Sequence, residues 1–379
     1  MPHYCYFPIL KTRPSEVNAY DMLDESVKQE ILPIIEMTGE LGYTYSKNCK
    51  DEKRRGTRRP GDINKKIPKI LDFMKERRFI LDITDDPTLK YDGLGSTDAG
   101  LLNPENGYAN WTNFLKQDEV FKKNVIPTIQ FNTMHMPDVE EQIRVLNAEF
   151  DYLAIRLPAI DSEQSSSKDI LPQVINYVTK LVDKNKLFII LDFGSKKDTV
   201  NIKTIVENIP LENVKALIPV SSSFPSSVTQ YGKKEGVIII HENEISDCVR
   251  EVLGTKVFHG DYSSIYPKRY EMGGGGWYPR IDFIERDIKT NKPISYRFFR
   301  GDERNTSSHY VPLANYVLNS SAYSPIQELT VDGDMRIKQK AAGGSEGKAP
   351  SYWIATRSNI YMTAQYLYLK KQSGSFLYL

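Results

Sequence analysis

Near-continuous apolar runs of strand length recur along this chain, and several of them end in charged residues. "KLFIILDFGSK" (186–196) places five apolar residues in the six positions that close on Asp192, and "RFILDITDD" (78–86) contains Asp82. A strand without polar alternation is typical of a sheet that is buried on both faces. Runs of this kind occupy residues 4–10, 31–37, 78–84, 125–131, 152–158, 187–193, 214–220 and 236–242.

Segments with helical spacing lie between most of these runs. Residues 138–150 place Val139, Ile143 and Leu146 on one face, residues 169–181 repeat the pattern, and Pro68 predicts a late start or a kink in the helix of 63–74. Buried strands alternating with amphipathic helices predict an α/β fold with a parallel sheet. Eight units in about 250 residues favour a (β/α)8 TIM-type barrel.

The predicted organisation is therefore a barrel over residues 1–262 and an irregular C-terminal extension over 263–379, packed on the barrel. A doubly wound open sheet stays open as the alternative, although no glycine-rich dinucleotide loop follows the first strand. The character of the chain changes near residue 260, where Tyr, Ser, Gly and Asn become frequent and clean periods disappear.

The ends of the strands carry the candidate site. In a parallel barrel the carboxyl ends of all strands meet at one rim, where the loops to the helices carry the functional residues. The strand interiors hold almost no polar residues, and the polar strand-end residues are Lys11, Arg13, Glu36, Asp82, Gln130, Asn132, Arg156, Asp192, Ser221 to Ser223, His241 and Glu242.

Two interpretations of the strand-end acids remain open. Oxygen ligands suit Mg²⁺ or Mn²⁺, so the set Glu36, Asp82, Asp192 and Glu242 is a candidate metal site. A catalytic set for phosphodiester hydrolysis would then be Asp82, Asp192, Glu36 and His241. In the alternative, the acids pair with Lys11, Arg13 and Arg156 in an ion-pair network, because buried charges need partners.

A basic segment follows the second predicted strand. Residues 50–66 contain eight Lys or Arg and three acids, a local charge of +5. Together with Lys11, Arg13 and Arg156, its residues Arg54, Arg55, Arg58 and Arg59 are candidates for binding phosphates of a nucleotide or nucleic acid. The alternative is a solvated loop, which is how most charge runs behave.

Composition narrows the class of protein. The formal net charge is +1, no run of about 18 apolar residues is present, and the start lacks the features of a signal peptide, so we expect a cytoplasmic protein without a membrane span. The three cysteines form neither a CxxC pair nor a disulfide framework. The sequence contains neither the GxSxG motif of serine hydrolases nor a complete phosphate-binding loop.

The late aromatic residues have two possible roles. Trp277, Tyr278 and Trp353 fit either a core or a stacking surface.

Several short motifs resemble the beta protein family of temperate and satellite phages and bacterial defence islands. They are "YFPILKTRPSEVNAYDML", "ILPIIEM", "IRLP", "IILDFG", "GDYSSIYP", the late "RGD", the "GDMRI" stretch and the region of Trp353, and they span nearly the whole chain. Where many members read "WR…NHH", this chain reads "YWIATRSNIYMTAQ", so a role for those histidines does not carry over.

The resemblance implies a setting rather than a reaction: members look like accessory proteins linked to phage exclusion or immunity. Two hypotheses follow. In the first, the barrel rim recognises a phage-derived or nucleotide ligand and regulates a partner effector, a protein encoded nearby. In the second, the protein is a metal-dependent phosphodiesterase or nuclease that uses the acidic strand ends. A third possibility is a mainly structural subunit of a larger complex, which would bind neither metal nor phosphate and would purify with a stable partner.

Overall fold

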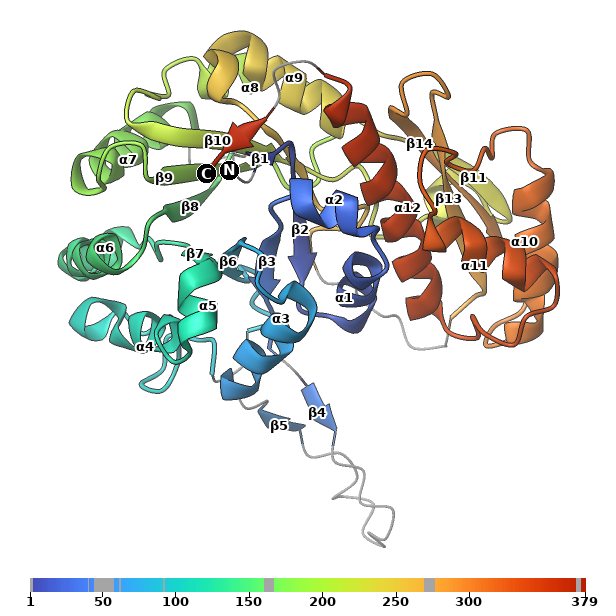
Figure 1. Cartoon of the computed structure of the whole chain (residues 1–379), viewed down its shortest axis with the longest axis horizontal. Helices are drawn as coiled ribbons and strands as arrows, with labels where there is room; N and C mark the ends of the chain where they lie inside the picture. Colours follow the sequence, from blue (N-terminus) through green and yellow to red (C-terminus); the bar gives the residue numbers. More distant parts are fainter. Residues whose placement is uncertain are drawn as a thin grey trace, which may run out of the picture.

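The computed structural model describes residues 3–39, 63–90, 93–159, 167–268, 277–372 and 376–379, and the backbone of 41–43 and 58–60. Parallel strands and helices alternate through the first two thirds of the chain (Figure 1), which confirms the α/β prediction. Its parallel strands are β2 (Tyr6–Lys11), β3 (Ile34–Met37), β6 (Phe79–Ile83), β7 (Val125–Pro127), β8 (Leu153–Pro158), β9 (Leu187–Asp192), β10 (Val214–Val220) and β12 (His259–Asp261).

The parallel strands form two hydrogen-bonded sheets. One has the order β12-β2-β3-β6-β7 and the other the order β10-β9-β8. Single parallel bridges, Thr128↔Ala154 and Leu217↔Val257, join the sheets at both seams, so the ladder is not the uninterrupted one of a closed barrel. The strands follow one another in sequence order without the reversal that a doubly wound sheet requires.

A buried core lies between the two sheets and draws on all of their strands except β12, which Phe258 and Tyr262 of the core flank. It contains Phe7, Ile9, Ile34, Ile80, Ile126, Ala154, Phe188, Ile190, Ala216, Ile218, Val220 and Phe258 among others. Gly260 lets β12 fit at one seam: a Cβ there would lie 2.7 Å from Ile218 Cγ2 and 2.9 Å from the Phe7 carbonyl oxygen. A larger core packs the helices against the outer faces of the strands.

The helices of this part are α1 (Pro14–Asp21), α2 (Glu25–Glu30), α3 (Lys66–Met74), α4 (Glu105–Leu115), α5 (Glu119–Asn124), α6 (Met136–Glu149), α7 (Ser167–Leu181), α8 (Ile202–Val206) and α9 (Glu242–Leu253). The prediction from Pro68 is confirmed, because a 3-10 turn over Ile63–Lys65 precedes α3 and the proline lies in its first turn. Helix α6 buries Val139, Ile143 and Leu146 as its spacing predicts.

The C-terminal part is built around an antiparallel sheet of order β11-β14-β13, from Glu235–Ile239, Pro293–Arg300 and Arg280–Arg286. The prediction that residues 236–242 form a strand of the parallel set was wrong. Val237 and Ile239 are 37% and 51% exposed on an edge strand, and β12 takes the place beside β2 instead. A solvent-facing Val or Ile looks the same in sequence as a buried one.

Helices α10 (Tyr310–Asn319), α11 (Asp332–Ala341) and α12 (Pro350–Lys370) complete this part. Helix α12 lies between the antiparallel sheet and the parallel-strand part (Figure 1). Most of its side chains are buried on every face, which is why residues 358–369 show no amphipathic period and did not predict one long helix. The chain ends meet where β1 (His3–Tyr4) pairs with β15 (Leu377–Tyr378).

Candidate functional site

Three predicted residues lie side by side on adjacent strands: Lys11 on β2 is paired in register with Glu36 on β3, which is paired with Asp82 on β6. Each lies two positions after an isoleucine of the core between the sheets. Because side chains alternate along a strand, the same face that is apolar inside becomes charged at its carboxyl end.

Arg156 on β8 is the centre of the site and uses all five of its N–H donors. One terminal nitrogen donates to Glu36 Oε2 (2.9 Å) and to Asp82 Oδ2 (3.0 Å). Nε and the other terminal nitrogen donate to Asp192 Oδ2, at 3.0 and 2.7 Å, and the latter also donates to the Tyr262 hydroxyl at 2.7 Å. The guanidinium therefore has no N–H left for a further ligand.

We call Lys11, Glu36, Asp82, Arg156, Asp192 and Tyr262 the Arg156 cluster. Further hydrogen bonds and one ion pair fix its carboxylates: Thr84 Oγ1 to Glu36 Oε1 (2.7 Å), Thr128 Oγ1 to Asp82 Oδ1 (2.9 Å), the Gly194 N–H to Asp192 Oδ1 (2.8 Å), the Tyr262 hydroxyl to Asp192 Oδ2 (2.6 Å), and Lys11 Nζ beside Glu36 Oε1 (3.4 Å). Asp192 is the most exposed of the three acids, at 14% of its side chain.

Burial and neighbouring charge set the pKa values in opposite directions within the cluster. Burial raises the pKa of Glu36, but Lys11 and Arg156 outweigh it and lower the value to about 2. Burial raises the pKa of Asp82 to about 6, with Arg156 opposing and the exposed Asp85 adding to the rise. One carboxylate is thus held firmly ionised, whereas its neighbour titrates near neutrality.

The predicted Mg²⁺ or Mn²⁺ site does not fit this arrangement. The Arg156 guanidinium lies between Glu36, Asp82 and Asp192, in the place that a shared cation would need. Glu242, the fourth predicted ligand, lies elsewhere. Across the described ranges, no group of three or more His, Cys, Asp or Glu side chains is arranged to hold a metal ion.

Glu242 and His241 are not strand-end residues of the parallel sheets, because the strand before them belongs to the antiparallel sheet. Glu242 begins α9, and its buried carboxylate accepts from the Ser223 N–H (2.8 Å), the Ser223 hydroxyl (2.7 Å) and the Tyr296 hydroxyl (3.2 Å). The pKa of Glu242 is raised by burial. His241 contributes its backbone N–H to the same network (2.9 Å). The predicted roles of Glu242 as a metal ligand and of His241 as a catalytic residue both rested on the wrong strand assignment.

Of the remaining predicted cations, Arg13 is the one whose side chain the structure describes, and it does not join the Arg156 cluster. Arg13 immediately precedes α1, where its charge acts on Glu16. Arg54 and Arg55 lie outside the described residues. The backbone of Arg58 and Arg59 belongs to β5 (Arg58–Pro60), which pairs with β4 (Leu41–Tyr43). The prediction of phosphate contact by this segment stays a prediction.

Tyr262, Thr84 and Thr128 are site residues that sequence reasoning missed. Thr128 lies two residues after the core residue Ile126, and Tyr262 two residues after Gly260. Counting in steps of two from each strand interior would have found both.

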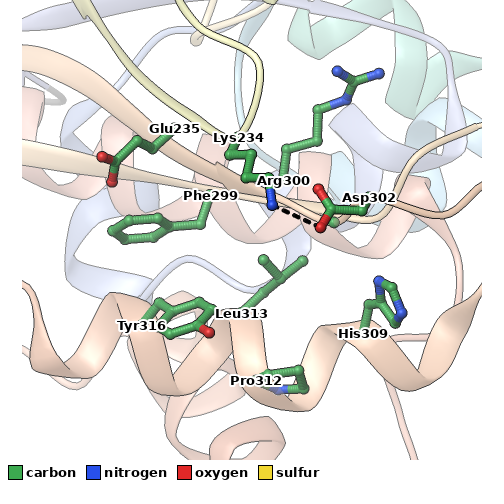
Figure 2. Close-up of a pocket in the computed structure, with 10 residues that line it drawn as sticks. Lys234, Glu235, Phe299, Arg300, Asp302, His309, Pro312, Leu313 and Tyr316 are labelled. Atoms are coloured by element: carbon green, nitrogen blue, oxygen red, sulfur yellow. Dashed lines mark hydrogen bonds and ion pairs between the residues drawn. The ribbon is translucent and has the colours of Figure 1, made fainter.

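A separate cavity of about 450 Å³ lies beside β14 and α10 (Figure 2). Phe299, Leu313 and Tyr316 form its apolar wall, and Lys234 is paired with Asp302 (2.8 Å) at its side. Arg300 lines this cavity and also a second one of about 290 Å³. No strand-end pattern points to either, because both lie between elements distant in sequence.

Within the described part of the chain, no helix has both the length and the apolar character needed to cross a bilayer. Among solved structures, the chain is similar to a mutant tryptophan synthase alpha-subunit from the hyperthermophile Pyrococcus furiosus, at 9% identity, over 68% of this chain and 86% of that one. The TM-score of 0.37 is too low to support an inference.

Similarity of sequence is more informative. The chain is 26% identical over 378 residues to Protein beta of Enterobacteria phage P4, covering 96% of this chain and 93% of the relative. The model of the family described as Beta protein matches residues 6–366. These two matches cover nearly the whole chain and confirm the family resemblance of its motifs. The chain belongs to the Beta protein family.

Proposed function

We propose that this protein is an accessory protein of phage exclusion or antiviral defence, and that the Arg156 cluster is a recognition or regulatory site acting on a partner effector. In this proposal the two parallel sheets form a (β/α)8-type barrel over residues 1–262, with 263–379 as an extension packed on it. The core shared by both sheets and the bridges at both seams support the barrel.

The observation that carries the recognition role is the complete use of the Arg156 donors by neighbouring side chains. A phosphate would find no free N–H there, whereas the carboxylates keep unused lone pairs. The cluster holds three acids and two cations, a formal charge of −1. It therefore suits a hydrogen-bond donor with positive charge, such as a basic side chain of a phage-derived polypeptide, better than a nucleotide.

A cationic ligand would also have a way to regulate. It would compete with Arg156 for Asp192, which is the most exposed acid and supplies two of the five hydrogen bonds. Loss of those bonds would release Arg156 and Tyr262 from Asp192 together. The bound and released arrangements are discrete, so a partner protein could distinguish them.

Phage plating efficiency on cells that carry the intact locus tests the proposal. Asp192→Asn keeps the shape of the side chain but removes its charge. Asp198→Asn is the matched control, since Asp198 is 61% exposed and its partners are Lys196 and the Val200 N–H at the surface. We expect protection to fall with Asp192→Asn and to persist with Asp198→Asn, once thermal melting shows that both variants fold. Full protection by a folded Asp192→Asn protein would refute the role of the cluster.

The alternative, a metal-dependent phosphodiesterase, has one favourable observation: Asp82 titrates near neutrality, as a proton-transferring acid would. Arg156 would have to leave the acids before a metal ion could bind. Millimolar Mn²⁺ distinguishes the two, because a ligand of the native state must raise its melting temperature. A rise that Asp192→Asn abolishes supports the hydrolase, and no rise supports the recognition role.

A further inference from the structure

The second cavity that Arg300 lines, called the Arg300 cavity below, lies between the loop that follows β10 and the C-terminal part of the chain. Its volume is about 290 Å³, close to the lower end of small-molecule sites. Two arginines, Arg280 and Arg300, line it together with the exposed Ser227 and Thr229. None of these residues belongs to the Arg156 cluster, so the inference does not depend on the proposed function.

Arg300 differs from Arg156 in how little it is engaged. Among the described residues its contacts are one hydrogen bond to the Lys233 carbonyl oxygen (3.2 Å) and stacking on the Tyr278 ring at 3.9 Å. No carboxylate of the described part pairs with it. Its guanidinium therefore keeps donors in a planar arrangement that matches the oxygens of a phosphate.

The charges nearby leave the cavity positive. Asp282 is the acid among the lining residues, and it is shared between Arg280 (2.8 Å) and the buried Arg357 (2.6 Å). Asp282 is thus already shared by two arginines, and the carboxylate that does act on Arg300, Asp302, is itself paired with Lys234. In the larger neighbouring cavity, by contrast, Lys234 is paired with Asp302, so that cavity holds no comparable excess.

Tyr310 forms the inner wall of the cavity. The residue is completely buried, and its hydroxyl lies near the Arg280 backbone without a hydrogen bond of ordinary geometry to any described residue. Because the hydroxyl has almost no accessible surface, a ligand in the cavity does not reach it. Tyr310 therefore supports the shape of the cavity rather than supplying a hydrogen bond.

Aromatic rings complete the lining. Trp277 stacks on Tyr310 with centroids 5.8 Å apart and planes 19° apart, and Tyr310 stacks on Trp353 at 5.1 Å. Tyr310 and Trp353 are buried, whereas Trp277 is half-buried, so a planar ligand group can pack against Trp277. We propose that this cavity binds a nucleoside monophosphate, with the phosphate on Arg300, the base against Trp277 and the sugar hydroxyls near Ser227 and Thr229.

Titration calorimetry of the full chain with AMP, adenosine and inorganic phosphate tests this assignment. We expect saturable binding of AMP, and weaker binding of the other two probes because each lacks one half of the contacts. Arg300→Gln should weaken AMP by about tenfold or more, the usual effect of a lost charged hydrogen bond. Arg297→Gln is the matched control, as Arg297 lies on the same strand and pairs with Glu285 instead (2.8 Å).

Trp277→Leu gives a second measurement that does not depend on folding of the Arg300 variant. It removes the indole ring, and we expect a several-fold loss of affinity for AMP and for adenosine with little change for inorganic phosphate. Three results would overturn the proposal: no AMP binding at millimolar concentration, equal affinity for AMP and adenosine, or wild-type AMP affinity in both Arg300→Gln and Trp277→Leu. Asp192→Asn should bind AMP as the wild type does, which separates this site from the Arg156 cluster.

Discussion

The Arg156 cluster and the Arg300 cavity both bring arginine and aspartate side chains together with tyrosines, but in opposite proportions. Three carboxylates surround Arg156 and occupy every donor of its guanidinium, whereas Arg300 stacks on Tyr278 and meets no carboxylate among the described residues. The first arrangement leaves carboxylate acceptors unused, whereas the second leaves guanidinium donors unused. The same residue types therefore predict opposite ligands, and the difference lies in which groups are already satisfied.

The largest expected effect comes from removing the centre of the acidic cluster. Arg156→Met leaves Glu36, Asp82 and Asp192 buried without their shared partner, and such a break costs about 3–5 kcal/mol of unfolding free energy. Arg300→Met, in the half-buried cavity position, should cost about 1 kcal/mol or less. Urea unfolding at neutral pH measures both. Equal losses of unfolding free energy would contradict the view that Arg156 is fully paired and Arg300 is not.

Acid should weaken the protein through Glu36. Its pKa is lowered from the ordinary 4.5 to about 2, so its contribution is present above pH 4.5 and is lost as the pH falls towards 2. A shift of that size corresponds to about 3 kcal/mol. Unfolding free energies measured between pH 2 and 5 should show this loss in the wild type and not in Glu36→Gln. A parallel profile in the two proteins would contradict the ion pairing of Glu36.

Asp82 should act in the opposite sense and over a higher range. Its pKa is raised from 3.8 to about 6, so the native state holds a proton that the unfolded state has released. The contribution is favourable below pH 3.8 and is lost as the pH rises through 6, by about 2–3 kcal/mol. Asp82→Asn should therefore gain stability relative to the wild type between pH 4 and 7. If the difference in unfolding free energy between Asp82→Asn and the wild type stayed constant over that pH range, the raised pKa of Asp82 would be ruled out.

The smallest effect separates two buried tyrosines. The Tyr361 hydroxyl donates to Asp261 Oδ2 (3.0 Å), so Tyr361→Phe should cost about 1 kcal/mol. The Tyr310 hydroxyl lies near the Arg280 backbone without a hydrogen bond of ordinary geometry to a described residue, and Tyr310→Phe should stay within about 0.5 kcal/mol of the wild type. Melting of the two variants side by side provides the check. A clear loss with Tyr310→Phe would reveal a partner for that hydroxyl.

Much of the acidic cluster could be predicted from sequence. Glu36, Asp82, Arg156 and Asp192 were all placed at strand ends, and pairing of the acids with Arg156 was one of the two open interpretations. The errors came from residues 236–242, whose apolar character suits an exposed edge strand as well as a buried one. This wrong strand assignment also placed His241 and Glu242 at the predicted rim.

The Arg300 cavity could not be predicted, because it depends on contacts between distant segments. Residues 226–229 follow a parallel strand, Arg280 and Arg300 lie on antiparallel strands, and Tyr310 begins a helix. No periodicity in the sequence relates these positions. The late aromatics gave a hint of stacking but no indication of the arginines they would meet.

The sequence by itself determined the alternation of buried strands and helices, since periodicity follows from which faces of each segment must avoid water. It also determined where charge begins on each strand. Only the tertiary structure decided which charges meet: Arg156 contacts Glu36 across 120 positions of chain because the two sheets share a core. Whether an arginine is satisfied or free depends on those distant neighbours, and that difference sets the chemistry of each site.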